Sequence, residues 1–286
     1  MNSQELKGSK PHRLIIIAGP TAVGKTAHAV RLAQELGTEI ISCDSRQFYR
    51  EMRIGVARPT DDELAAAKHH FIACRSVTEP YNIYDYEHDA MAVIEQLLET
   101  YDTVVAVGGS GLYIDALRSK PAVLPSPSDE LRAMLQQMPI EEKRSQLRLL
   151  DPEYYSKVDL RNPVRLQRAL EVCLTAGRPY SDIIDEQEFQ PRPFSVEVRV
   201  LQMEPTVLRE RIDRRVDQMM ADGLLDEVRS LMPYRHLNTL NTVGYRELFP
   251  VIEGNGTLED AVAMIKLNTW HYARKQLTWC RRYQYL

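Results

Sequence analysis

Short apolar runs alternate with stretches of helical periodicity along the first 120 residues of the chain. The apolar runs at 14–18, 38–43 and 103–107 have the length of buried strands. Residues 27–36 and 84–100 carry apolar side chains at the spacing of an amphipathic helix. Strands joined by crossover helices pair in parallel and bring their loops together at the carboxyl ends of the strands. The pattern therefore predicts an α/β core, in which helices flank a parallel sheet.

A change of pattern between two proline-marked boundaries predicts an insertion in this core. The boundaries are residues 121–127 and 189–194, and strand alternation resumes at 196–201. The helical stretches between the boundaries are 129–137, 140–150, a start at Asp151, and 162–175, which ends at Gly177. We therefore predict an all-helical insertion domain at 121–195 within a core made of residues 1–120 and 196–286. One long helix is predicted at 206–231, and a turn at Val243-Gly244-Tyr245.

The turn between the first strand and the first helix fits the phosphate-loop pattern G-x-x-x-x-G-K-[ST] at every position. Its residues are Gly19, Pro20, Thr21, Ala22, Val23, Gly24, Lys25 and Thr26. Glycines let the backbone fold around an anion, and the N–H groups at the helix start point into that hollow. Lys25 adds a charge, and the Thr26 hydroxyl can hold Mg²⁺. The alternative is a glycine-rich turn that binds nothing, but the strand and helix on either side favour a P-loop NTPase-like core that binds a di- or triphosphate.

Asp44 follows the second strand and is expected to lie beside the phosphate loop. A carboxylate in that place is a candidate general base or metal ligand, and the alternative is a capping or turn aspartate. The third strand ends in Gly108-Gly109-Ser110, where an ATPase typically has an acidic residue that orders Mg²⁺ and water. This ending disfavours a motor or switch ATPase.

Composition excludes several classes of protein. The net charge of −4 argues against a general nucleic-acid coat, and 44% hydrophobic residues are ordinary for a globular protein. The four cysteines lie far apart, which predicts reduced and mostly buried thiols, with neither a zinc site nor a disulfide framework. No apolar run approaches the ~20 residues of a membrane helix, and the polar first ten residues do not form a signal peptide. We expect a cytoplasmic protein, and we assign no metal to His69-His70.

Three regions carry clustered cations. Arg161, Arg165 and Arg168 recur at helical spacing, which is typical of a solvated face or of a nucleic-acid contact. Residues 265–286 hold five Lys or Arg and no acid, interleaved with tryptophans and tyrosines, a composition that suits either stacking on unpaired bases or packing on the core. The long helix carries Arg209, Arg211, Arg214 and Arg215, which either form salt bridges along the helix or reach a bound phosphate.

Taken together, these motifs resemble the bacterial-type tRNA dimethylallyltransferase (tRNA isopentenyltransferase) family. The matching stretches are GPTAVGKT at 19–26, DSRQFYREMRIGVARP at 44–59, GGSGLY at 108–113, NPVRLQRALEV at 162–172, NTVGYRE at 241–247 and RKQLTWCRR at 274–282. Two departures stand out: Ser110 replaces the family's usual threonine, and Arg46-Gln47 replaces its usual apolar pair.

The resemblance implies transfer of a dimethylallyl group from dimethylallyl diphosphate to N6 of adenosine 37, next to the anticodon of tRNA. It implies that Asp44 accepts the N6 proton, that Thr21 contacts substrate, and that Lys25, Arg215 and Mg²⁺ on Thr26 stabilise the diphosphate. It also implies contacts with the anticodon stem-loop, at Asp44, Ser45, Arg46, Gln47, Ser110, Arg132, Arg165, Gln167, Arg168, Val243, Gly244, Tyr245, Arg246, Arg274, Gln276, Trp279 and Arg281.

We further expect a monomer with no membrane partner. Two other enzymatic readings remain open: a P-loop small-molecule kinase that uses Asp44 to activate a hydroxyl, and an adenylate isopentenyltransferase. The insertion and the basic-aromatic tail disfavour the latter. A non-catalytic RNA-binding module would use the tail alone.

Overall fold

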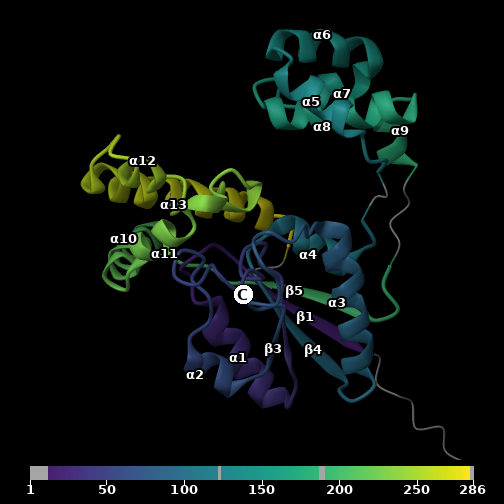
Figure 1. Ribbon diagram of the computed structural model, residues 1–286. Helices are drawn as coiled ribbons and strands as arrows, with labels where there is room; N and C mark the ends of the chain where they lie inside the picture. Colours follow the sequence, from purple (N-terminus) through teal and green to yellow (C-terminus); the bar gives the residue numbers. More distant parts are fainter. Residues whose placement is uncertain (1–11, 122–123, 187–190, 284–286) are drawn as a thin grey trace, which may run out of the picture. The chain divides into compact units, whose positions relative to one another are not determined.

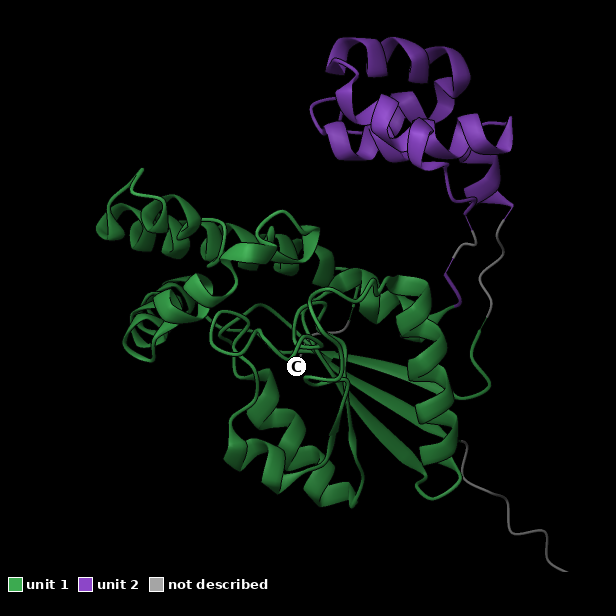
Figure 2. Cartoon of the chain, in the orientation of Figure 1, with its two compact units in different colours: residues 1–119, 191–286 green, residues 120–190 purple. Residues whose placement is uncertain are grey.

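The structure is a computed structural model that describes residues 12–121, 124–186 and 191–283 (Figure 1). The chain divides into two compact units (Figure 2), of which the first comprises Met1–Ser119 and Pro191–Leu286 and the second Lys120–Gln190. The predicted insertion at 121–195 extends a few residues too far, because Ser195 is the first residue of a core strand and pairs with Arg13.

A five-stranded parallel sheet forms the centre of the first unit. Its strands are β1 (Arg13–Ala18), β2 (Ile40–Ser42), β3 (His69–His70), β4 (Thr103–Val107) and β5 (Ser195–Val200). The strand order is β3-β2-β4-β1-β5, so β4 lies between β1 and β2, which are consecutive along the chain. This order confirms the parallel α/β core and adds the short edge strand β3.

Helices cover both faces of the sheet (Figure 1). Side chains alternate along β1: Ile15 and Ile17 pack with α1 (Lys25–Leu36), whereas Leu14 and Ile16 pack with α3 (Ile83–Leu98) and α4 (Gly111–Arg118). Strands buried on both faces read as continuous apolar runs, which explains the pattern of the sequence. The remaining helices of this unit are α2 (Asp61–Ala66), α10 (Pro205–Ala221), α11 (Leu224–Ser230), α12 (Phe249–Ile252) and α13 (Leu258–Cys280), with 3₁₀ turns η1 (Met232–Tyr234) and η2 (Asn238–Leu240).

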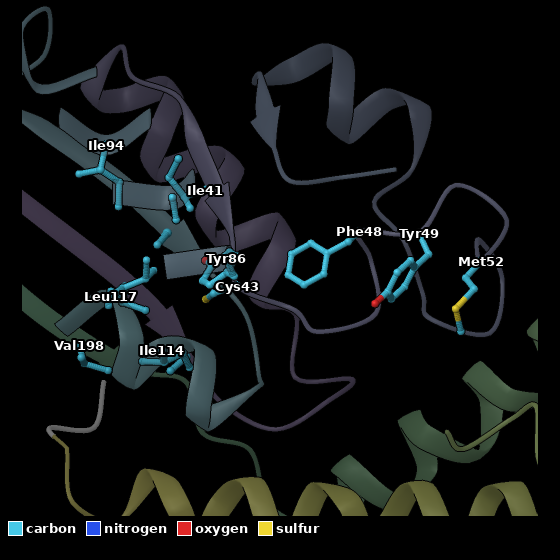
Figure 3. Packing of buried hydrophobic residues seen from close by; sticks show 14 of the residues in the cluster. Ile41, Cys43, Phe48, Tyr49, Met52, Tyr86, Ile94, Ile114, Leu117 and Val198 are labelled. Carbon is cyan, nitrogen blue, oxygen red and sulfur yellow. The ribbon is translucent and has the colours of Figure 1, made fainter. Parts of the chain in front are cut away.

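The irregular segment at 46–60 is anchored to the core despite its polar sequence. Phe48, Tyr49 and Met52 are buried, and Figure 3 shows them beside the cluster that contains Tyr86. The ring of Phe48 lies 5.4 Å from the ring of Tyr86, a spacing typical of packed aromatic pairs. This segment follows Asp44 directly, so the same packing fixes the surroundings of that carboxylate.

The second unit is all helical, as predicted. Its helices are α5 (Asp129–Gln137), α6 (Ile140–Leu150), α7 (Pro152–Lys157), α8 (Pro163–Ala176) and α9 (Tyr180–Asp185), of which α9 was not predicted. Leu135, Leu147, Leu166 and Leu170 form its core. The buried carboxylate of Asp151 caps α7 through the N–H of Tyr154 and accepts hydrogen bonds from the N–H and hydroxyl of Ser181.

The prediction of one helix over 206–231 is wrong. The backbone leaves the helical region at Gly223, whose φ of 100° lies in the left-handed region that favours glycine, and α11 begins directly afterwards. Arg209, Arg211, Arg214 and Arg215 therefore all lie on α10, before the break.

Candidate active site at the carboxyl edge of the sheet

The phosphate loop joins β1 to α1 in the predicted way. Gly19 has a φ of 143°, and a Cβ at this position would stand 2.8 Å from the carbonyl oxygen of Leu201. Gly24, with a φ of 101°, is the N-cap of α1, which begins at Lys25. The conformation of this loop therefore requires glycine at two positions, and it places the amino end of α1 at the hollow of the loop.

Lys25 is a partly buried cation within this loop. Its Nζ donates a hydrogen bond to the carbonyl oxygen of Pro20 at 2.8 Å. Burial lowers the pKa of Lys25 to about 8, and the positive charge of Arg215 contributes to the same direction. A partly buried cation close to a second cation favours an anionic ligand, because the ligand's negative charge stabilises both.

Arg215 is the arginine of α10 that contacts the phosphate loop. Its Nη1 lies 3.1 Å from the hydroxyl oxygen of Thr21 and donates a hydrogen bond to it. Arg211 lies one helical turn earlier and lines the same cavity as Arg215. Arg209 instead pairs with Asp213, and Arg214 donates to the carbonyl oxygen of Glu210. The structure thus separates the four arginines into two that face the cavity and two that have partners on their own helix.

Two cavities meet at Asp44. The polar cavity, of about 360 Å³, lies over the phosphate loop and is lined by charged and hydroxyl side chains, among them Lys25, Thr26, Arg58, Glu63, His69 and Arg211. The apolar cavity, of about 220 Å³, is lined mainly by Val56, Val216, Met219, Val243, Ile265 and Tyr272. Thr21, Asp44 and Arg215 line both. This arrangement can hold a diphosphate on one side of a carboxylate and an apolar group on the other.

The carboxylate of Asp44 is oriented by its own loop. Its Oδ1 accepts a hydrogen bond from the N–H of Arg46 at 2.9 Å, which forms an Asx turn. The next residue, Ser45, donates its N–H to the hydroxyl oxygen of Ser110 at 3.1 Å. Asp44 is therefore a turn aspartate, which was the alternative considered from the sequence. In this turn its side chain still lines both cavities.

Glu227 on α11 is a site-forming residue that sequence reasoning missed. Its carboxylate accepts hydrogen bonds from three consecutive backbone N–H groups, those of Arg53, Ile54 and Gly55, at 2.7 to 3.0 Å. It also accepts one from the Tyr245 hydroxyl at 2.6 Å. These bonds connect two segments that line the apolar cavity, around Gly55 and around Gly244. No motif marks Glu227, because three of these four partners are backbone groups distant in sequence.

The predicted contact between Tyr245 and tRNA is wrong. Its side chain is completely buried, and its ring fills the space that a Cβ on Gly55 would need, 2.5 Å away. Burial and the neighbouring Glu227 raise the pKa of its hydroxyl. Tyr245 therefore supports the wall of the apolar cavity from behind and has no surface to offer to RNA.

Other predicted contacts lie in varied surroundings. Gln47 points inward and donates to the carbonyl oxygens of Val56 and Ala57, while Val243 and Gly244 line the apolar cavity. Gln276 is only 7% exposed. Arg46 lines the apolar cavity too.

The predicted cationic contacts divide between the two units. In the first unit Arg274 and Arg281 are exposed on or just after α13, and Arg246 pairs with Glu247. In the second unit Arg165 is exposed, Arg168 and Gln167 both bond to Glu171, and Arg132 pairs with Asp129.

The described residues include the cysteines, the histidine pair and the helices to which the predictions on thiols, metals and membrane spans refer. The four cysteines are free thiols, of which Cys74 is exposed and the other three buried, as predicted. No three His, Cys, Asp or Glu side chains gather to hold a metal ion in the part of the chain that the structure describes. The pair His69-His70 forms β3, and His70 bonds to Glu39. None of the described helices is long and apolar enough to cross a membrane.

Comparison with known proteins gives consistent matches over nearly the whole chain. Residues 47–283 match the family described as IPP transferase. The tRNA dimethylallyltransferase of Flavobacterium johnsoniae is 45% identical over 279 residues, which cover 94% of this chain and 90% of the relative. The tRNA dimethylallyltransferase 1 of Bacteroides thetaiotaomicron is 45% identical over 273 residues, with 94% and 88% covered.

Two solved structures also match this chain over most of its length. The full-length tRNA isopentenylpyrophosphate transferase of Bacillus halodurans is 34% identical, with a TM-score of 0.69 over 96% of this chain and 89% of that one. A eukaryotic dimethylallyltransferase, described as acting on tRNA, is 26% identical and has a TM-score of 0.81, with 94% and 70% covered.

Proposed function

The chain belongs to the IPP transferase family, and from this premise we propose that it transfers a dimethylallyl group from dimethylallyl diphosphate to N6 of adenosine 37 in tRNA. The observation that carries the proposal is the meeting of a cationic cavity and an apolar cavity at one carboxylate, Asp44. A prenyl diphosphate has this division of chemistry, with an anionic head and an apolar tail joined at the reacting carbon.

The polar cavity holds the diphosphate. It is lined by the residues at the start of α1, among them Lys25, and by Arg215 on α10. As the bond between C1 of the donor and the diphosphate oxygen breaks, negative charge grows on the leaving group. Donors and cations already in place stabilise that charge more in the transition state than in the ground state.

The oxygen ligands of this cavity fit Mg²⁺. Thr26 supplies a hydroxyl at the start of α1, and the carboxylates of Asp44 and Glu63 line the same space. Mg²⁺ usually keeps several waters and takes only one or two protein oxygens beside substrate phosphates, so a full protein cage is not needed. When bound, the ion neutralises charge on the diphosphate.

The apolar cavity receives the dimethylallyl group and the target adenine, in contact at Asp44. The N6 lone pair is delocalised into the purine ring, which makes N6 a weak nucleophile. N6 attacks C1 of the donor, the bond from C1 to oxygen breaks, diphosphate leaves, and a proton passes from N6 to the Asp44 carboxylate. A positioned general base of this kind typically contributes about 10²–10⁴ in rate.

The acceptor must leave the stacked anticodon loop to reach this cavity. Extrusion of a base costs a few kcal/mol and is balanced by contacts with the surrounding RNA. We assign those contacts to exposed cations of both units, Arg274 and Arg281 in the first and Arg165 in the second. We also propose that the enzyme acts as a monomer in the cytoplasm, where tRNA is found and where thiols such as its four free cysteines stay reduced.

Incubation of the protein with dimethylallyl diphosphate, Mg²⁺ and an anticodon stem-loop RNA tests the proposal. Digestion to nucleosides should yield N6-(dimethylallyl)adenosine, and a stem-loop with guanosine in place of adenosine 37 should yield no product. ATP in place of the donor should be neither hydrolysed nor used to phosphorylate a small molecule. Phosphoryl transfer from ATP without prenyl transfer would support the kinase reading, and RNA binding without either reaction would support a binding module.

A further inference from the structure

Gln276 is a buried residue of α13 with both of its polar side-chain atoms paired. Its Oε1 accepts a hydrogen bond from the backbone N–H of Thr21 at 2.7 Å, and its Nε2 donates one to the carbonyl oxygen of Gly109 at 2.9 Å. Thr21 lies in the phosphate loop, and Gly109 lies in the loop that follows β4. One amide thus joins two loops that enter the site from different strands. This geometry replaces the expectation that Gln276 contacts tRNA.

The connection continues to the carboxylate of the site. Ser110, which follows Gly109, bonds to Ser45 through the Ser45 N–H at 3.1 Å and between the two hydroxyls at 3.2 Å. Ser45 is the residue after Asp44. A chain of hydrogen bonds therefore runs from the phosphate loop through Gln276 to the loop that carries Asp44.

Thr21 is held from two sides by this arrangement. The backbone N–H of Thr21 donates a hydrogen bond to Gln276, and the Thr21 hydroxyl accepts one from Arg215. The packing leaves Gln276 little freedom, since a Cβ on Gly109 would stand only 2.2 Å from its Nε2. A neighbouring contact is equally close: a Cβ on Gly111 would stand 2.5 Å from the indole nitrogen of Trp279, also on α13.

We infer that Gln276 is a positioning residue, which sets the phosphate loop and the Asp44 loop at the separation that the reaction needs. The inference rests on the proposed function for its kinetic consequence. Its structural part, the connection of the two loops, is independent of which substrate the site takes. Small displacements of reacting groups cost large factors in rate, so a residue that fixes two loops influences chemistry without touching substrate.

The kinetic test replaces Gln276 by methionine, which has a similar length and neither hydrogen bond. We expect kcat/KM for dimethylallyl diphosphate to fall about 10- to 100-fold, the scale for loss of buried hydrogen bonds. Affinity for the stem-loop RNA should stay within about twofold, because no RNA contact is removed. The matched control is Q34M, the same change in α1, where an exposed glutamine bonds to the carbonyl oxygen of Ala66.

A second readout needs no activity. Deuterium exchange in the free protein should become faster in Q276M at residues 19–24 and 109–113 but stay unchanged there in Q34M. In Q276E the acceptor for the Thr21 N–H is kept and the donor to Gly109 is lost, so exchange should rise more at 109–113 than at 19–24. The affinity of the free protein for inorganic pyrophosphate should fall several-fold in Q276M.

Two results would overturn the inference. Unchanged exchange in both segments of Q276M and Q276E would show that Gln276 does not hold the loops. A loss confined to RNA affinity, with normal donor kinetics, would make Gln276 an RNA contact instead. If wild-type protein transfers no prenyl group, the proposed function fails, whereas the exchange and pyrophosphate measurements still decide the role of Gln276.

Discussion

Replacement of Asp44 by asparagine separates the two roles that its position allows. The Asx turn needs only an acceptor oxygen for the N–H of Arg46, and the asparagine side chain supplies one. The general base needs a carboxylate oxygen directed at the substrate amine, and the asparagine amide offers an N–H₂ group or a weakly basic oxygen there. The loop should therefore keep its conformation while proton transfer is lost.

The expected magnitude follows from the base role. Loss of a positioned general base lowers the rate by about 10²–10⁴, which corresponds to about 2.7–5.5 kcal/mol in the activation free energy. Loss of a turn hydrogen bond alone would amount to about 0.5–1.5 kcal/mol, and it would appear in stability rather than in turnover. The two roles differ enough in size to be distinguished in one variant.

Single-turnover measurement with saturating donor and RNA isolates the chemical step. D44N should bind dimethylallyl diphosphate and stem-loop RNA within a few-fold of wild type and form product about 10²–10⁴ more slowly. The matched control is D102N, the same loss of charge on an exposed aspartate before β4, which should retain full activity. A D44N enzyme with a single-turnover rate within a few-fold of wild type would refute the mechanism and leave Asp44 as a turn residue.

Four further predictions concern other parts of the site. R215A should lower kcat/KM for the donor by about 10²–10³, whereas R214A, one residue earlier on α10, should change it little; steady-state kinetics will compare them. E227Q should lower the free energy of unfolding by about 1–3 kcal/mol in urea titrations, and a double-mutant cycle with Y245F should give a non-zero coupling energy. Chelation of divalent ions by EDTA should abolish prenyl transfer, and added Mg²⁺ should restore it. R165A and R274A should each reduce the slope of log affinity for RNA against log salt by about 0.7–0.9, and a slope equal to that of wild type would remove the arginine concerned from the interface.

Local signals predicted most of the elements. Ser128 and Asn162 mark the starts of α5 and α8, and their side chains accept the hydrogen bonds of N-caps. Gly177, whose φ is 67°, marks the end of α8. The apolar runs of β1 and β4 are continuous because both faces of the sheet are covered. The break at Gly223 was missed, since a single glycine within a periodic segment is compatible with an uninterrupted helix until its backbone conformation is known.

The residues of the site also fall into two groups, those that the sequence predicted and those that it did not. Lys25 and Asp44 were predicted because a motif and a strand end specify where they lie, and each has a hydrogen-bond partner nearby in sequence, Pro20 and Arg46 respectively. Glu227 and Gln276 were not assigned their roles, since each acts on backbone groups far away in sequence; Gln276 and Thr21 are 255 residues apart. Side chains that bond to backbone leave no complementary residue for a sequence pattern to show.

The carboxyl end of α13 shows why composition alone misassigns RNA contacts. Aromatic residues among cations suit stacking on bases, yet two of the aromatic residues here, Trp279 and Tyr283, are engaged by contacts within the protein. The indole N–H of Trp279 and the hydroxyl of Tyr283 both donate to Asp115 on α4, and Arg282 lies over the Trp279 ring, 4.6 Å from its centre. Cations and aromatics paired in this way fix α13 to the core, which in turn holds Gln276 against the phosphate loop. If the exposed Arg274 and Arg281 contact RNA phosphates, as we propose, binding there should depend strongly on salt and little on the identity of the bases.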